Sequence, residues 1–283
     1  MQEAIKAVIC MAIVTVSREL AALGDETAQE LADILHYRLV DKKCLEERMK
    51  NLGLTEQKIQ KYDERKPSFW SSLSQDRDNY LHYLKTAVFS EAGQGSCVII
   101  GRGCNALLRN IPGVLSVFLA AHLEIRLERV KSYFHCDKRR ARQIIDQSDR
   151  DRAGFHQSFF EISWKGLENY HLTLNTSLLH PELCASLIKT ALEQTITEET
   201  ETANTLRIKD LILGQQVVHH LLCEKAIPIH FLETSVQSGS VTLYGVVNSR
   251  PLAEAAIRSA KEVPAVCSVT SEIQVVQEYS VVP

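Results

Sequence analysis

Short apolar runs recur along the first two thirds of the chain and are separated by more polar stretches. The run at residues 8–16 is continuous and rich in β-branched side chains, which is typical of a strand buried on both faces of a parallel sheet. Four further runs lie at residues 37–40, 97–100, 114–120 and 171–174. The pattern therefore predicts five short strands.

Amphipathic helices are predicted between these strands. One apolar face has the spacing i, i+3, i+4 and i+7, and it is made by Ala28, Leu31, Ala32 and Leu35. Further helical patterns cover residues 124–133, 139–148 and 181–193. Alternating strands and helices predict an α/β fold, a five-stranded parallel sheet with helices on both faces. Ligands of such sheets bind at the carboxyl ends of the strands, so candidate site residues are sought there.

The pattern changes after residue 194. Residues 195–205 have no periodic apolar face, and we predict a linker over 195–206 between a first domain, 1–194, and a second, 207–283. The second domain shows a helix, a hairpin with its turn at 237–240, another helix and a last strand at 266–276. This order predicts a small α+β module of the form αββαβ.

Composition narrows the class of protein. A net charge of -3 gives no general attraction to nucleic acid or anionic membrane, so phosphate affinity must come from local clusters. The eight cysteines show no C-x-x-C pair and no zinc-type Cys/His grouping, and His219 and His220 on a predicted helix receive no role. No apolar run reaches the roughly 20 residues of a membrane span. We expect a cytoplasmic protein without a transmembrane segment or a nucleic-acid partner, and the sequence assigns no metal ligands.

The segment after the first strand, residues 17–27, stands where a P-loop protein carries G-x-x-x-x-G-K-[ST]. Of that pattern Gly24 is present, the lysine is absent, and Asp25 and Glu26 occupy the first helical turn. Arg18 is the cation that could substitute for the lysine, with Ser17 and Gly24 as nucleotide-binding candidates. The alternative is a plain strand-to-helix connection capped by acids.

Two further strand ends carry candidate substrate-binding residues. Arg102 lies between Gly101 and Gly103, where glycines permit close approach of a ligand and the guanidinium could grip a monophosphate. An ordinary surface ion pair is the alternative for this arginine. Asp41 follows the second strand, and it either faces the ligand or caps the next helix.

A dense charge cluster covers residues 138–152. Arg139 and Arg142 share one helical face and are nucleotide-binding candidates, and a repeat of alternating acid and arginine ends the segment: Asp149, Arg150, Asp151 and Arg152. A cationic helical flap of this kind could close over phosphates and neutralise charge during transfer. The alternative is a solvated helix with pairs such as Arg142 to Asp146 at i, i+4.

Taken together, these segments resemble the cytidylate kinase-like family, a branch of the nucleoside monophosphate kinases with a P-loop kinase-like fold, over residues 13 to about 193. The matching pieces are residues 13–19, 37–41, 98–103, 149–152 and 175–176. The resemblance implies that Arg102, Asp41, Asp149 and Asp151 bind the acceptor nucleotide. It further implies catalytic roles for Arg150 and Arg152, and use of ATP and Mg²⁺. Arg18 is the third catalytic candidate, as the cation that could replace the absent lysine. The family's lysine-bearing loop is not matched here.

Residues 210–276 resemble a BON domain, most clearly at 239–245. That resemblance implies an interaction module for lipid, a small ligand or another protein chain. Three hypotheses follow: a phosphotransferase acting on a nucleoside monophosphate, a non-catalytic nucleotide sensor with a degenerate P-loop, and a scaffold assembled through the tail. The shared expectation is that a nucleotide or another phosphorylated small molecule binds the first domain.

Overall fold

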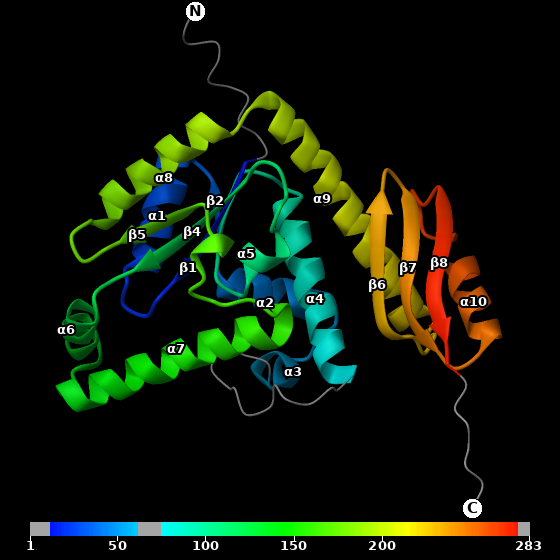
Figure 1. Cartoon of the computed structure of the whole chain (residues 1–283), viewed down its shortest axis with the longest axis horizontal. Coiled ribbons are helices and arrows are strands. Elements are labelled where there is room, and N and C mark those ends of the chain that lie inside the picture. The colour runs from blue at the N-terminus through cyan, green and yellow to red at the C-terminus, as the bar shows by residue number, and fades with distance from the viewer. Residues whose placement is uncertain (1–11, 62–74, 277–283) are drawn as a thin grey trace, which may run out of the picture. The chain divides into compact units, whose positions relative to one another are not determined.

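The computed structural model describes residues 12–61 and 75–276 (Figure 1). Backbone contacts divide them into two compact units, of which the first comprises 12–61 and 94–204 and the second 75–93 and 205–276. The helix α4, Gln75–Ala92, thus belongs to the second unit although its sequence lies within the first predicted domain.

The first unit contains the predicted five-stranded parallel sheet, in the order β2-β3-β1-β4-β5. Its strands are β1 (Ile13–Arg18), β2 (Arg38–Val40), β3 (Cys97–Ile100), β4 (Val114–Ala120) and β5 (Leu172–Asn175). Its helices are α1 (Gly24–Leu35), α2 (Lys42–Asn51), α3 (Glu56–Lys61), α5 (Cys104–Leu107), α6 (Leu123–Phe134), α7 (Lys138–Phe160) and α8 (Pro181–Thr195), with a 3₁₀ turn at Leu167–Asn169.

Both faces of this sheet are covered, as the apolar runs predict. On one face Val14 and Val117 pack with Leu31 of α1 and Ile188 of α8 in one buried cluster. On the other face, Phe118 packs against Trp164 and Tyr170. The predicted α/β fold class is therefore confirmed. Residues 8–11 of the predicted first strand lie outside the described residues.

Two predicted boundaries differ from the structure. The helix predicted over 139–148 continues to Phe160, so the acid and arginine repeat lies inside a helix instead of ending one. The irregular linker predicted over 195–206 is largely helical, because α9 spans Glu198–His219. Thr197 and Thr200 cap its start reciprocally, each hydroxyl accepting from the other's backbone N–H at 3.3 and 2.8 Å. Two buried positions of α9 are occupied by the polar residues Glu201 and Asn204. This explains why the sequence of this helix shows no periodic apolar face there.

The second unit contains a three-stranded sheet in the order β6-β7-β8, with an antiparallel and a parallel pair. Its elements after α9 are a π turn at His220–Glu224, β6 (His230–Gln237), β7 (Ser240–Val247), α10 (Arg250–Ala260) and β8 (Ser268–Val275). Leu213 and Val217 of α9 share a core with Leu243 of β7 and Ala256 of α10. The predicted αββαβ order is confirmed. Within residues 12–61 and 75–276, no helix is both long and apolar enough to cross a membrane.

Candidate functional site

The loop between β1 and α1 lies at the carboxyl edge of the sheet, the position where ligands of this fold class bind. It makes left-handed turns at Ala21 (φ 61°) and Leu23 (φ 53°), a conformation that glycine adopts at the lowest cost. Gly24 is required by packing, because a β-carbon there would lie 2.5 Å from Cβ of Arg18. The loop therefore folds tightly over the end of its own strand.

Arg18 is paired within this loop. Its Nη2 donates to Oδ1 of Asp25, in the first turn of α1, at 2.8 Å. Ser17 is buried and its hydroxyl donates to the side chain of Asn105 at 3.3 Å. Arg18, the cation predicted to replace the P-loop lysine, is therefore neutralised by an ion pair with Asp25.

This loop does not fit a P-loop type of ATP and magnesium site. Asp25 and Glu26 stand in the first helical turn, where such a site needs a cation and a metal-binding hydroxyl. The nearby hydroxyl of Thr27 is buried and donates to the carbonyl oxygen of Leu23 at 2.7 Å. In this conformation the loop offers a triphosphate neither the lysine nor the metal-binding hydroxyl of a P-loop.

The turn after β3 buries its arginine. Gly101, Arg102 and Gly103 have φ angles of 70°, 52° and 66°, and the Arg102 side chain is 1% exposed. Its Nη2 forms a close ion pair with Oε1 of Glu46 in α2. Asp41 caps α2, its Oδ1 accepting from the backbone N–H of Cys44 at 2.8 Å. Both candidate substrate-binding side chains are engaged within the protein.

The cluster on α7 faces several directions, because consecutive helical residues are about 100° apart. Arg150 is exposed and donates to Gln147 at 2.9 Å, whereas Asp151 is buried and accepts from the same side chain at 2.6 Å. Arg152 donates to Ser148 at 2.8 Å and lies 5.9 Å from the Trp164 ring centroid.

The predicted nucleotide-binding face of α7 is exposed. Arg142 pairs with Asp146 at 2.9 Å, as the i, i+4 alternative predicts, and Arg139 is exposed near the helix start. The structure therefore does not bring Arg18, Arg102 and the α7 arginines together through any contact among the described residues.

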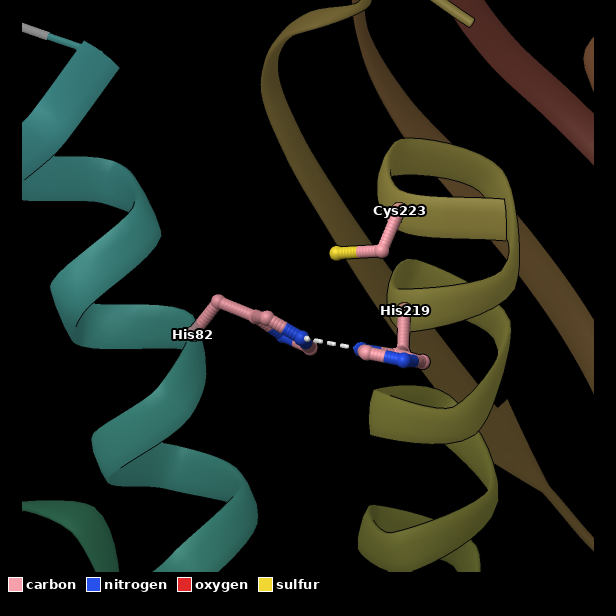
Figure 2. Close-up of side chains that lie close together, drawn as sticks. All are labelled: His82, His219 and Cys223. Carbon is pink, nitrogen blue, oxygen red and sulfur yellow. Dashed lines mark hydrogen bonds between the residues drawn. The ribbon is translucent and has the colours of Figure 1, made fainter. Parts of the chain in front are cut away.

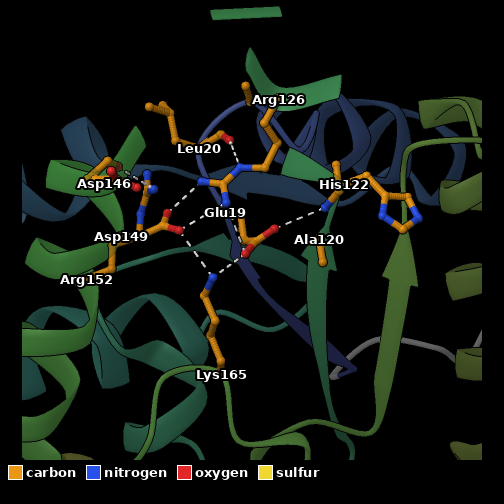
Figure 3. A network of polar contacts seen from close by, with 12 residues as sticks. Glu19, Leu20, Ala120, His122, Arg126, Asp146, Asp149, Arg152 and Lys165 are labelled. Atoms are coloured by element: carbon orange, nitrogen blue, oxygen red, sulfur yellow. Dashed lines mark hydrogen bonds and ion pairs between the residues drawn. The ribbon is translucent and has the colours of Figure 1, made fainter. Parts of the chain in front are cut away.

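Asp149 takes part in a network of four charges that the sequence did not predict (Figure 3). Both its oxygens accept from the guanidinium of Arg126 on α6, at 2.6 and 3.0 Å. The same guanidinium lies 3.2 Å from Oε1 of Glu19, the residue after β1. Lys165 contacts Glu19 closely and Asp149 at 3.2 Å. Two carboxylates and two cations thus join the β1 end, α6, α7 and the chain after α7.

This network extends from the protein interior to the surface. The side chains of Arg126 and Glu19 are 4% and 8% exposed, and Lys165 is 48% exposed. Burial raises the pKa of Asp149, but hydrogen bonds and charge from Arg126 and then Lys165 outweigh burial and hold the pKa below its ordinary value of 3.8. Glu19 also accepts from the backbone N–H of Ala121 at 3.1 Å.

Arginines of α6 also bind the carbonyl oxygens of the loop. Arg126 Nε donates to Leu20 at 2.8 Å, and Arg129 donates to Ala21 at 3.0 Å and to the carbonyl of Thr176 at 2.7 Å. Burial lowers the pKa of Arg129, and the charge of Glu26 opposes this shift. These contacts hold the loop in its left-handed conformation and direct its carbonyl oxygens toward α6.

Comparison with protein-family models gives two matches. The cytidylate kinase-like family matches residues 13–178, more than half of the chain. The chain belongs to the cytidylate kinase-like family. The BON domain matches residues 209–277, which confirms the fusion that the sequence motifs predict. A comparison with curated proteins gives no match.

Comparison with solved structures gives several similar chains. An uncharacterized protein from Eubacterium ventriosum is 18% identical with a TM-score of 0.51, covering 64% of this chain and 98% of that one. A shikimate kinase from Bacteroides thetaiotaomicron is 15% identical with a TM-score of 0.40, covering 64% and 98%. Shikimate kinase from Acinetobacter baumannii, in complex with shikimate, is 15% identical with a TM-score of 0.39, covering 68% and 99%.

In this cytidylate kinase-like protein, sequence reasoning missed Glu19, Arg126, Arg129 and Lys165. Glu19 lies within the family-like segment 13–19. Its position directly after β1 could have indicated a candidate site residue. Arg126 and Arg129 are spaced i, i+3 at the start of a helix that follows β4, which places them on one helical face near the sheet edge.

Proposed function

We propose that the kinase-like unit binds a nucleotide or a similar phosphorylated small molecule without transferring its phosphate. The observation that carries this proposal is the network of Glu19, Arg126, Asp149 and Lys165. Phosphoryl transfer requires cations that neutralise charge developing on the phosphate. Here each cation of the network is balanced by a carboxylate, and the loop contains no lysine.

The same network supplies a binding response. A phosphate that approaches Arg126 and Lys165 competes with Glu19 and Asp149 for the same donors. Since Asp149 lies on α7, its release would loosen α7 from the loop after β1. Anion occupancy at the sheet edge would thereby be converted into a change at a helix, which is what a nucleotide sensor requires. In this proposal the protein acts in the cytoplasm.

The BON module is the proposed output of this sensor. We assign it the binding of lipid, a small ligand or another protein chain, the partners that its family implies. The support is its independent core, in which α9 and α10 pack on one three-stranded sheet.

A second candidate function is a nucleoside monophosphate kinase activity that uses ATP and Mg²⁺. Two observations favour it: family membership, and the left-handed turns at Ala21 and Leu23, through which residues other than glycine turn the loop tightly. In this candidate Arg18, Arg150 and Arg152 are the catalytic cations, and ligand binding must first free Arg18 from Asp25.

Calorimetry and a coupled assay on the full chain separate these candidates. Each nucleoside monophosphate is titrated alone, and turnover is then measured with ATP and Mg²⁺. We expect binding of at least one monophosphate and no turnover above background. Turnover with any acceptor would support the kinase instead, and no binding of any monophosphate would overturn both.

A matched pair of variants tests the role of the network. Glu19→Gln removes one carboxylate competitor, so the affinity for the bound monophosphate should rise by about tenfold, as loss of one charged competitor predicts. Glu128→Gln is the control, because Glu128 is exposed and pairs with Lys131 on α6, outside the network. Equal affinities in the two variants would show that Glu19 does not compete with the ligand.

A further inference from the structure

Three side chains of the second unit converge from two helices that are far apart in sequence (Figure 2). His82 lies on α4, and His219 and Cys223 lie at the end of α9 and in the π turn that follows it. One nitrogen of each histidine and the Cys223 sulfur all lie within 4.8 Å of one another. In the described part of the chain this is the one grouping of three such ligands, and neither the kinase-like nor the BON match assigns it a role.

The spacing of the two rings fits a tetrahedral metal ion. His82 Nε2 and His219 Nδ1 are 3.4 Å apart. Two nitrogens bound to zinc at about 2.05 Å with a tetrahedral angle are separated by about 3.4 Å. A nitrogen and a thiolate sulfur bound to the same ion lie about 3.6 Å apart. The Cys223 sulfur therefore needs to move only a short distance toward the two histidine nitrogens.

The ring of His82 is held in the tautomer that a metal requires. Its Nδ1 lies 3.0 Å from Oε1 of Gln215, so Nδ1–H donates to that oxygen and Nε2 presents its lone pair to His219 and Cys223. His82 is also buried, so the packing around its ring fixes the ring's orientation. A ring with a fixed tautomer and one lone pair directed at the ion is the form of histidine that binds metals.

The helix places its residues on one side. Gln215, His219 and Cys223 follow one another at intervals of four, which places them on one side of the end of α9 and of the π turn that continues it. The regular helix ends at His219 and widens into a π turn over His220–Glu224, a feature that is frequent at functional sites. Cys223 is exposed, which leaves a solvent-accessible side for metal entry and for a fourth ligand.

We propose that His82, His219 and Cys223 form a transition-metal site of the N₂S type, with zinc as the ion and with an open fourth position. The donor set of two imidazoles and one thiolate suits zinc. On binding, the Cys223 thiol releases one proton to solvent, and the ring proton of His219 moves from Nδ1 to Nε2. Gln215 acts as a positioning residue through His82. The site joins the helix α4 to the end of α9 within one compact unit.

Cobalt titration of the full chain tests this site. Protein stripped with a chelator and kept reduced is titrated with Co²⁺ and then with Zn²⁺. We expect one equivalent of Co²⁺, a thiolate-to-cobalt charge-transfer band, and loss of that band when Zn²⁺ is added. Cys223→Ser should abolish the band, and His219→Asn should weaken metal binding by at least about tenfold, with a similar effect of Gln215→Ala through the lost orientation of His82.

Two controls lie close by in the same unit. His220→Asn removes the neighbouring histidine, which pairs with Glu224 at 2.6 Å, and Cys267→Ser removes another exposed thiol. Both should bind metal as the unaltered protein does. The proposal is overturned if no charge-transfer band appears, or if the band survives Cys223→Ser and disappears in Cys267→Ser.

A measurement on the unaltered protein covers the case in which a variant does not fold. Alkylation of Cys223 should slow by at least about tenfold on addition of equimolar Zn²⁺, while Cys44 and Cys267, which are also exposed, keep their rates. Equal rates at Cys223 with and without Zn²⁺ would refute the site. Nucleotide binding to the first unit does not enter either readout, so failure here is distinct from failure of the proposed function.

Discussion

Arg126→Met is the substitution that tests most directly whether the four-charge network holds the sheet edge together. The change removes two hydrogen bonds to Asp149, one to the Leu20 carbonyl and an ion pair with Glu19. Both carboxylates then keep Lys165 as the remaining cation of the network. Breaking a buried ion pair by removing one partner costs about 3–5 kcal/mol. Because Lys165 remains, we expect about 3 kcal/mol, a large part of a typical domain stability of about 5–15 kcal/mol.

Two matched substitutions calibrate this number. Arg142→Met removes an exposed i, i+4 pair with Asp146 on α7 and should cost about 0.5 kcal/mol. Lys165→Met removes a half-exposed cation from the same network and should cost about 1 kcal/mol. The expected order of destabilisation is therefore Arg126, then Lys165, then Arg142.

Urea unfolding at pH 7 measures the three costs. Trp164 is buried beside the network and serves as a fluorescent probe of the first unit. The measurement uses a Trp70→Phe background, so that Trp70, which lies outside the described residues, does not contribute to the signal. The reasoning is refuted if Arg126→Met destabilises the first unit no more than Arg142→Met does. That result would mean that the carboxylates find water or other partners at no cost, and that the network does not fasten α7.

Three further predictions concern backbone conformation and pH. Ala21→Gly should stabilise the first unit by about 0.5–1 kcal/mol, because φ is 61° there, whereas the buried control Ala22→Gly should destabilise it; thermal unfolding measures both. Gly239→Ala should destabilise the second unit by more than about 1 kcal/mol, since φ is 81° and the new β-carbon would lie 2.9 Å from a backbone carbonyl oxygen; Gly53→Ala, with φ 99° and open space, should cost the backbone strain alone. The lowered pKa of Asp149 stabilises the fold above the ordinary value of 3.8, and this contribution is lost as the pH falls through the lower pKa of the folded protein. The stability advantage over Asp149→Asn should therefore shrink with acidification, and a constant difference in an unfolding series over acidic pH would contradict it.

The strands were predictable because the relevant signal is local. A strand covered on both faces must be apolar at nearly every position, so β3 and β4 appear in the sequence with the bounds that the structure has. The ends of the helices were harder to predict from the sequence. The acid and arginine repeat was interpreted as the end of a segment, but α7 passes through it, because Arg152 and Asp151 find partners one turn earlier on the same helix. The polar inward face of α9 concealed a helix for the corresponding reason.

By itself, the sequence determined the fold class, the family and the αββαβ order of the tail. Tertiary structure alone decided which charges meet. Glu19 follows β1 whereas Arg126 lies on α6, and His82 and His219 are 137 positions apart. Local patterns encode burial and periodicity, since these depend on near neighbours. The partner of a charge depends on which segments the packed core brings to one place, and the local sequence around an arginine does not specify that.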